Sequence, residues 1–550
     1  MRATSGILKG LNPTVAIASK LIVIGFVLFC AIYANQAGQY FERTSAILLE
    51  NVKWFYISLV SIILGFLMYL MASRYGHIRL GHDDEKPEFA YLPWLAMLFS
   101  GGMGIGLIFW SVSEPMLHYA GNPFAQGLTN EAASTAMLLS FFHWGLHPWS
   151  IFIIVALALS YFSYRKDLPC TLRSVLYPLI GDRIYGPIGH TVDILSVTIT
   201  AFGIAQVLGM GVIQINSGLH YALGMDMSLQ TQLLTVLLLC SLAVISVLSG
   251  VGRGVRRLSE WNMFLSLVFV VVLLLVGPTR YIINTFLESS GDYLQNIIGL
   301  SFWSDTQGDS NWQNSWTAYY WPWWMVTAPF VGMFIARISK GRTIRELISG
   351  AMIVPTIITF IWFAVFGGTA LKEEQDARLA YQQQVQKAVV AEASQPFTGG
   401  LVLKATKEDS TSALFVMLKT MDAAGLGSVL SILACLLLAT YFITSADSGT
   451  LILCTLDAVG ATEPPRFIRV LWGCLIAVIA SVLLYAGGLQ AIQAASILAG
   501  FPIAIFMALM SATLFYCIRK EPIPWTMLPK HVHPEHMIKD SVHELSTDRT

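Results

Sequence analysis

The chain has 550 residues, of which 55% are hydrophobic and 12% charged, and its mean hydropathy is +0.63. This composition excludes a soluble globular protein, because apolar stretches of about 20 residues, the length that crosses a bilayer, recur along most of the sequence. The 33 Lys and Arg residues balance the 33 Asp and Glu residues, so the net charge points to no charged partner. We expect no nucleic-acid partner.

Hydrophobic windows of this length predict about twelve membrane-spanning segments in a lipid bilayer. They are residues 14–34, 52–72, 91–115, 131–161, 190–218, 230–249, 258–278, 316–338, 347–370, 427–452, 466–486 and 490–517. The expected fold class is therefore an all-α polytopic membrane protein. Lys and Arg concentrate in every second loop, which by the positive-inside rule predicts that both termini are cytoplasmic.

The third segment is unusual in its glycine content. The stretch SGGMGIGLIFWSVSEP (residues 100–115) holds the alternating glycines Gly102, Gly104 and Gly106 and one acid, Glu114. Glycine costs a helix interior about 1 kcal/mol relative to alanine, and freed backbone carbonyls at membrane depth are tolerated only beside protein or a watery cavity. We therefore expect a break in this helix and, at the break, a binding site for an ion and a substrate.

A second interrupted segment is expected in the other half of the chain, since inverted-repeat transporters place such segments at matching positions. Segments three to seven and eight to twelve form two sets of five. The first member of the second set carries Pro322, Pro329 and Gly332, and proline removes an intrahelical hydrogen bond. The alternative is that Pro and Gly are simply more frequent in membrane helices.

This repeat predicts the organisation of the chain. We expect an N-terminal tail with two peripheral helices (1–90), a first five-helix repeat (91–278), an amphipathic helix at the interface or packed outside (279–315), a second repeat (316–517) with an external segment (371–411), and a cytoplasmic tail (518–550). The helix after residue 278 is predicted from apolar residues at three- to four-residue spacing.

Tryptophans lie deep within the predicted membrane segments. Trp144, Trp149 and Trp324 are far from the segment ends where aromatic residues usually anchor. Their rings can surround a quaternary ammonium, for roughly 0.5–2 kcal/mol per ring when desolvated. The nearby His143 and His147 lie four residues apart, but no third metal ligand stands out, so helix packing explains them better than a metal site.

Polar residues also gather in the tenth segment, around Tyr441, Thr444 and Ser445. Hydroxyl and backbone oxygens are ligands for a hard cation such as sodium, and beside the broken third segment they would form a sodium site. The commoner alternative is that Ser and Thr hydroxyls return a hydrogen bond to the preceding turn. No nucleophile motif or acid pair is present, so we expect a transporter and not an enzyme.

The sequence resembles the betaine/carnitine/choline transporter family from about residue 14 to 517. The resemblance is carried by GMGIGLIFW (102–110) with SEP (113–115), HWGLHPW (143–149), PFVGMFIARISKGRTIRE (329–346) and TSADSGT (444–450). It implies a LeuT-type fold of ten core helices in a 5+5 inverted repeat preceded by two extra helices. It also implies a homotrimer in the bacterial inner membrane that imports a small quaternary ammonium or zwitterionic solute.

The resemblance further implies a substrate site. Its residues would be Trp144, Trp149, Phe152, Trp323, Trp324, Thr327, Met103, Gly104 and Gly106. Phe152 stands where relatives often have Tyr, and Thr327 where they usually have a further Trp. Because one indole wall is missing, glycine betaine, carnitine, choline, a sulfonium analogue and ectoine all stay open as substrates.

Coupling to sodium is favoured over sodium-independent exchange of trimethylammonium compounds. The glycine motif is intact, and segments five and seven contain no Lys or Arg that could replace the ion. By resemblance, Na⁺ would be held by backbone oxygens of Ser100, Met103 and Tyr441 and by the hydroxyls of Thr444 and Ser445. A second sodium would involve Thr200, although Ile204 one turn later speaks against that site.

Overall fold

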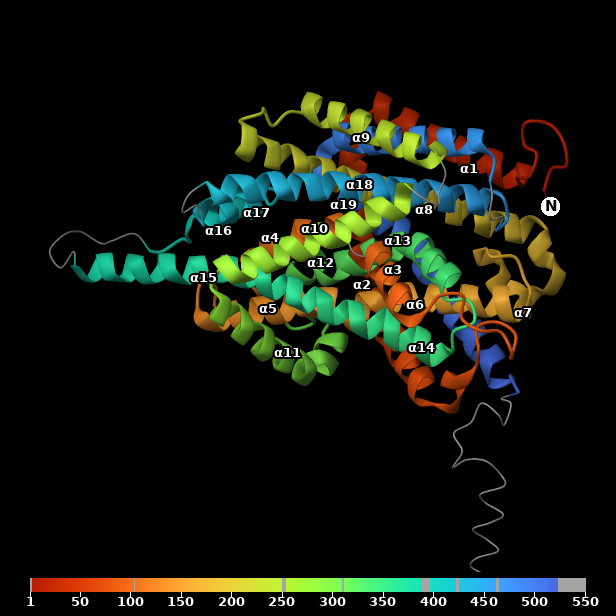
Figure 1. The fold of residues 1–550 in the computed structure, drawn as a ribbon, viewed down its shortest axis with the longest axis horizontal. Helices are drawn as coiled ribbons and strands as arrows, with labels where there is room; N and C mark the ends of the chain where they lie inside the picture. The colour runs from red at the N-terminus through yellow and green to blue at the C-terminus, as the bar shows by residue number, and fades with distance from the viewer. Residues whose placement is uncertain are drawn as a thin grey trace, which may run out of the picture.

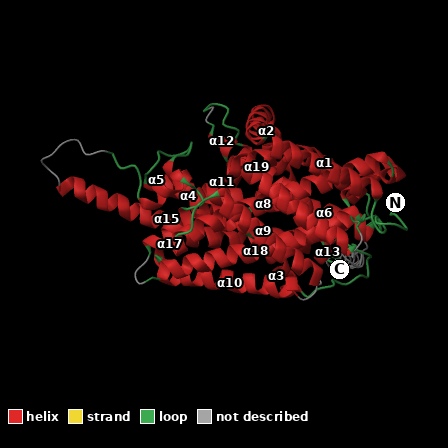
Figure 2. Cartoon of the chain, turned by 90° about the horizontal axis from the view of Figure 1, so that it is seen from above, coloured by secondary structure: helices red, strands yellow, loops and turns green. Residues whose placement is uncertain are grey.

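The computed structural model describes residues 2–102, 104–249, 254–308, 311–387, 396–421, 425–460 and 464–522. Within these ranges all regular structure is helical, which confirms the all-α prediction. The helices form one elongated bundle, with α1 and α9 along one long edge, α11 along the other and α13 between them (Figure 1). Figure 2, turned by 90°, shows the same dense helical packing.

The α-helices follow one another along the whole described chain. They are α1 (Pro13–Ile32), α2 (Ala34–Ala72), α3 (Tyr91–Gly102), α4 (Ile105–Ala120), α5 (Asn130–Trp144), α6 (Leu146–Ser160), α7 (Tyr177–Ile180), α8 (Pro187–Leu223), α9 (Leu229–Ser249), α10 (Gly254–Val276), α11 (Thr279–Phe302), α12 (Trp312–Ser315), α13 (Thr317–Ile338), α14 (Ile344–Ile348), α15 (Val354–Lys387), α16 (Leu401–Glu408), α17 (Ala413–Thr420), α18 (Leu426–Asp457) and α19 (Arg466–Arg519).

Nine helical stretches in the described ranges are long and apolar enough to cross a membrane. The number is below twelve partly because the third predicted segment is divided into α3 and α4, of 12 and 16 residues. In addition, α19 counts once although its backbone leaves the helical region at Gly487 and Gly488, between the last two predicted segments. The polytopic class is therefore supported, and the number twelve stays a prediction.

Glycines let the central helices approach closely. A Cβ on Gly449 of α18 would lie 2.6 Å from Ile204 of α8, and one on Gly332 of α13 would lie 2.7 Å from Val155 of α6. Without bulk water between helices, membrane proteins gain stability mainly from such close packing. These contacts pair α18 with α8 and α13 with α6, and Gly203 of α8 joins the two pairs, since a Cβ there would lie 2.8 Å from Val326 of α13.

The predicted interruption of α13 is wrong. The helix runs without a break from Thr317 to Ile338, although Pro322 and Pro329 both lie inside it. A Cβ on Gly500 of α19 would meet the Cβ of Pro322 at 2.6 Å, so a neighbouring helix packs directly against this turn. Prolines are tolerated in such helices because the surroundings hold the backbone. The alternative considered above, that Pro and Gly are simply more frequent in membrane helices, therefore applies to α13.

An unexpected break instead divides the fourth predicted segment at Gly145, between α5 and α6. The backbone there has φ −90° and ψ −138°. A Cβ on Gly145 would lie 2.9 Å from the hydroxyl oxygen of Tyr293 in α11, and this hydroxyl accepts a hydrogen bond from the Leu146 N–H at 3.0 Å. The break brings Trp144 to the end of a helix, where its side chain faces the bundle centre.

The predicted external segment begins inside a helix. Instead of ending near residue 370, α15 continues to Lys387 and projects from one end of the bundle (Figure 1). The buried carboxylate of Glu374 in α15 accepts hydrogen bonds from the backbone N–H groups of Gly400 and Leu403, at 2.6 and 2.9 Å. This carboxylate ties the start of α16 to α15.

Candidate functional site

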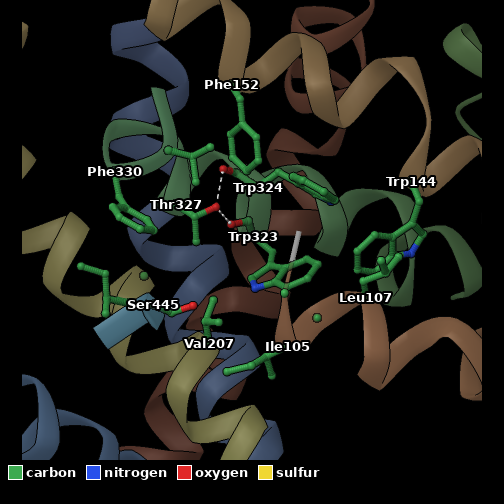
Figure 3. Close-up of a pocket in the computed structure, with 15 residues that line it drawn as sticks. Ile105, Leu107, Trp144, Phe152, Val207, Trp323, Trp324, Thr327, Phe330 and Ser445 are labelled. Carbon is green, nitrogen blue, oxygen red and sulfur yellow. Dashed lines mark hydrogen bonds between the residues drawn. The ribbon is translucent and has the colours of Figure 1, made fainter. Parts of the chain in front are cut away.

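A cavity of about 90 Å³ lies where the interrupted third segment meets α6, α8, α13 and α18. This volume far exceeds the roughly 10–15 Å³ that one water molecule requires. Figure 3 shows the lining residues, which are Gly104, Ile105, Gly106, Leu107, Trp144, Phe152, Gly203, Ile204, Val207, Trp323, Trp324, Thr327, Phe330, Val331 and Ser445. The lining carries no charged side chain and is mostly aromatic and aliphatic.

The predicted break in the third segment is present at this cavity. The first half, α3, ends at Gly102, and α4 begins at Ile105 after Gly104, whose backbone is extended with φ −173° and ψ −142°. No side chain caps the start of α4. The Leu107 N–H bonds to the Gly104 carbonyl at 3.1 Å, so the first turn presents the N–H groups of Ile105 and Gly106 and the positive end of the helix dipole to the cavity. Met103 lies outside the described residues.

Gly106 is required at its position because two indoles pack against its backbone. A Cβ on Gly106 would lie 2.6 Å from Cη2 of Trp323 and 3.4 Å from Cη2 of Trp144. The first distance is shorter than any van der Waals contact, and the rings are embedded in packed helices. The glycine therefore lets the aromatic side chains approach the backbone of the broken segment.

Three indoles form the aromatic walls of the cavity. The ring centroids of Trp144 lie 5.6 Å from Trp323 and 5.4 Å from Trp324, and those of Trp323 and Trp324 are 5.6 Å apart. The planes meet at 69°, 76° and 64°, the edge-to-face geometry that aromatic pairs prefer. Phe152 adds a fourth ring, 5.0 Å from Trp324. These four rings are called the aromatic box below.

Two other predicted substrate residues take different positions. Trp149 does not line the cavity but packs behind the box, 5.8 Å from Phe152 and 6.1 Å from Trp324. Thr327 does line it, and its hydroxyl donates to the backbone carbonyl of Trp324 at 3.0 Å. The hydroxyl proton is thus used within the helix, and only the oxygen lone pairs and the methyl group of Thr327 are available to a ligand.

The predicted sodium residues on α18 face the break. Ser445 lines the cavity, and the Tyr441 ring lies 3.7 Å from where a Cβ on Gly104 would sit. The Thr444 hydroxyl accepts from the Asn262 amide at 3.1 Å and donates to a carbonyl of the preceding turn. That return bond is the alternative considered for the sequence. Asn262, an amide in an otherwise apolar segment, was not predicted as a partner.

The other residues predicted to bind sodium are Ser100, Met103 and Thr200. The side chain of Ser100 lies outside the described residues, as Met103 does. Thr200 is fully buried in α8, and its hydroxyl has no hydrogen-bond partner among the described residues. It does not line the cavity, whereas Ile204, one turn later, does.

The sequence analysis missed the role of Glu114, a fully buried carboxylate in α4. It accepts from the Trp144 indole at 2.7 Å and the Tyr320 hydroxyl at 2.5 Å. It also contacts Nδ1 of His143 at 2.7 Å and Nε2 of His118 at 3.3 Å. The deep indole of Trp144 thus has a polar partner. The sequence did contain a sign of this role, because an ionisable residue such as Glu114 within a membrane segment marks a functional site by default.

The two histidines singled out from the sequence have separate partners. His147 contacts the Ser301 hydroxyl of α11 at 2.7 Å, which joins two helices as the packing interpretation expects. His143 instead belongs to a cluster with Glu114 and His118, whose ligand atoms all lie within 4.8 Å of one another. This spacing would suit a metal ion, but the hydrogen bonds within the cluster already account for it.

Comparison with known proteins agrees with the resemblance. A model of betaine/carnitine/choline family transporters matches residues 14–523. A probable glycine betaine transporter of Desulfitobacterium hafniense is 39% identical over 511 residues, 92% of this chain and 98% of that protein. The glycine betaine transporter OpuD of Bacillus subtilis is 40% identical over 484 residues, 87% and 89% of the two chains. A glycine betaine/proline/choline transporter of Vibrio parahaemolyticus is 37% identical over 528 residues, 93% and 90%. The chain therefore belongs to the betaine/carnitine/choline family of membrane transporters and is not an enzyme.

Proposed function

We propose that this transporter is a sodium-coupled symporter that imports a zwitterionic quaternary ammonium solute of the glycine betaine type by alternating access. The observation that carries the proposal is the aromatic box, three indoles meeting edge to face around a cavity beside a broken helix. The names of the three relatives described above support the same substrate class.

The cationic end of such a solute fits the box. A trimethylammonium group has no N–H donors and therefore forms no hydrogen bond to a carboxylate on the wall, but aromatic faces attract its diffuse charge. The cavity lining matches this requirement, since it holds four aromatic rings of the box and no acidic side chain. The absent Trp wall at Thr327 leaves room for a headgroup larger than trimethylammonium.

The anionic end has donors available. The indole nitrogens of Trp323 and Trp324 are buried and have no hydrogen-bond partner among the described residues. In Figure 3 the Trp323 nitrogen points toward the side of the cavity where Val207 and Ser445 lie. The N–H groups at the start of α4 open into the same cavity, and helix N-termini bind carboxylates readily. The carboxylate of a zwitterion could use both sets of donors, whereas choline offers them only one hydroxyl oxygen.

Sodium would supply the coupling ion and the positive charge that holds the two halves of the site together. The donor set fits a hard cation, because the C-terminal carbonyls of α3, the Tyr441 carbonyl and the hydroxyls of Thr444 and Ser445 are all oxygen ligands. No Lys or Arg lines the cavity to take the place of the ion.

Uptake by the protein in proteoliposomes tests the proposal. We expect radiolabelled glycine betaine to accumulate under an inward sodium gradient and not when potassium replaces sodium. Ser445→Ala should raise the sodium concentration needed for half-maximal uptake. Ser431→Ala is the matched control, since that hydroxyl lies on the same helix and donates to the Gly427 carbonyl at 2.8 Å. Uptake that ignores sodium and requires substrate inside the vesicle would replace symport by exchange.

A further inference from the structure

We infer that Glu114 is the positioning residue of the aromatic box and the source of its preference for a charged headgroup. Its carboxylate holds the Trp144 and Tyr320 side chains in place and puts a negative charge directly behind the box. This inference rests on the proposed function, because it concerns how the same cavity distinguishes a quaternary ammonium from a neutral group of equal shape.

The carboxylate is surrounded by donors on both oxygens. Oε2 accepts from Trp144 and Tyr320, and Oε1 contacts the two histidines His143 and His118. Glu114 and both histidines are completely buried, as is Tyr320. An ionised carboxylate offers about four lone-pair positions, so these four contacts use its full accepting capacity. Glu114 therefore fixes four side chains that come from α4, α5 and α13.

The outer contacts of the two histidines determine which way they face. The Trp312 indole donates to Nδ1 of His118 at 3.3 Å, so the proton of a neutral His118 lies on Nε2, directed at Glu114. His143 contacts the Thr317 hydroxyl through Nε2 at 2.9 Å, which turns its Nδ1 toward the carboxylate. Hydrogen bonds from several such donors suit a carboxylate anion, and each is stronger than a bond between neutral groups.

The charge lies where it can act through the Trp144 ring. In Figure 3 the indole nitrogen of Trp144 is on the side of the ring away from Trp323. The edge of the ring is therefore bound to Glu114 while its remaining surface borders the cavity. A hydrogen bond to an anion polarises the donor, and electrostatic effects are strong where water is excluded. The ring becomes a better partner for a cation, but a neutral headgroup gains nothing from this.

A carboxylate can therefore contribute to the box without lining the cavity. No carboxylate lines the cavity, so none competes with the methyl groups for contact. One carboxylate, that of Glu114, lies behind the wall, and only the Trp144 ring separates it from the cavity. The box can thus combine an apolar surface with a negative electrostatic potential.

Ligand binding by the purified full-length protein tests this inference. Competition against radiolabelled glycine betaine in sodium buffer gives affinities for glycine betaine itself and for 3,3-dimethylbutanoate, which has a carbon in place of the nitrogen. In the wild-type protein we expect a clear preference for glycine betaine. Glu114→Gln should weaken glycine betaine binding roughly 5- to 30-fold and change the affinity of the isostere, whose headgroup is uncharged, less than about twofold.

Two further variants separate this role from a purely structural one. Trp144→Phe keeps a ring but removes the N–H, so Glu114→Gln should add less than about twofold in that background. Trp144→Phe by itself should lower the preference for glycine betaine, and it tests the inference even if Glu114→Gln does not fold. Glu374→Gln is the matched control, since it alters a buried carboxylate in α15 that accepts from the backbone N–H groups of Gly400 and Leu403, away from the cavity lining.

The outcomes are distinct. If Glu114→Gln weakens both ligands equally, or leaves glycine betaine binding unchanged, Glu114 is only a structural residue and the inference is wrong. The same holds if the wild-type protein binds the two ligands equally well. If the wild-type protein binds no glycine betaine in sodium buffer, the proposed function fails first.

Discussion

The glycine-rich α3–α4 segment and the proline-containing α13 face each other across the cavity, and only the first is broken. Gly106 lacks the side chain that would keep two indoles away from the backbone, and α4 starts after Gly104 without a side-chain cap. Each proline of α13 removes one hydrogen bond, but the turns around it stay packed against α6 and α19. In this protein, the segment whose glycines lack side chains is broken, whereas the helix whose prolines lack backbone N–H groups is continuous.

The broken segment and α13 therefore contribute different chemical groups to the site. The broken segment contributes backbone polarity and the buried acid Glu114, while the continuous α13 contributes Trp323, Trp324 and Tyr320 on a regular helical scaffold. A rigid helix keeps aromatic rings at fixed angles, and a helix end presents groups that bind charge. Four experiments test this difference between the two segments, starting with the largest expected effect.

The largest effect is expected from Gly106→Ala. The added Cβ would overlap the Trp323 ring, and forced overpacking of this kind costs up to about 3 kcal/mol, so glycine betaine affinity should fall by about 100-fold. Isothermal titration of the purified protein measures this change. Gly121→Ala is the control, because a Cβ there meets no atom within 4 Å. Equal affinities of the two variants would mean that the box does not need to contact the broken segment.

Trp324→Ala comes next, since it removes one wall of the box from the continuous helix. Binding of glycine betaine should weaken by about 1–3 kcal/mol, as expected for loss of a desolvated cation–π contact together with some packing. The same titration applies, with Trp54→Ala as control because the Trp54 side chain is 63% exposed on α2. An unchanged affinity would remove Trp324 from the substrate site.

A smaller effect on stability is expected at Glu521, a carboxylate outside the membrane segments that contrasts with Glu114. Burial opposes its ionisation, but hydrogen bonds from Lys166, Tyr161 and Arg165 outweigh this and lower the pKa of Glu521 below its ordinary 4.5. Because the folded pKa is the lower one, these bonds stabilise the fold above the ordinary value, and this stability is lost as the pH falls through the folded pKa.

Thermal unfolding of Glu521→Gln measures that contribution. We expect a loss of about 1 kcal/mol at pH 7, since the group is partly reached by solvent. The difference from the wild-type protein should shrink as the pH is lowered below 4.5. If the stability difference between Glu521→Gln and the wild-type protein is constant with pH, the ionised carboxylate is not the group that holds the end of α19 against the residues that follow α6.

The smallest effect is expected for Pro329→Ala, which tests the continuity of α13 directly. Because the helix is already regular at this position, sodium-driven uptake of glycine betaine should stay within about twofold of the wild-type rate, and stability should change by less than about 1 kcal/mol. A complete loss of uptake with normal folding would mean that α13 must open during transport, as expected if both this helix and the third segment were interrupted.

Several features were accessible from the sequence because they depend on local chemistry. The helical class follows from long apolar stretches, and the break near Gly104 follows from glycine content. The walls Trp144 and Trp324 could be identified because indoles this deep in a membrane segment need a reason. Trp323 was expected only from the family resemblance, and the equally deep Trp149 packs behind the box instead of lining the cavity. The closeness of Ser445 to the break was expected from the polar cluster and is present in the cavity lining.

Other features could not be predicted from local composition. Glycine and proline mark α13 as strongly as the third segment, yet its continuity depends on neighbours such as Gly500 of α19. The break at Gly145 depends on the hydroxyl of Tyr293, which lies almost 150 residues away along the chain and takes the freed N–H of Leu146. Single-segment analysis contains no information on either neighbour.

Hydropathy and backbone preference are properties of adjacent residues. They were therefore enough to predict that this chain is helical, that it belongs in a membrane and that one glycine-rich segment would open beside aromatic side chains. Only the tertiary structure decided which buried polar groups meet. Glu114 contacts Trp144 and Tyr320, which are 30 and 206 positions away. A buried carboxylate must be matched by donors, and the packing of α4, α5 and α13 alone determines which donors those are.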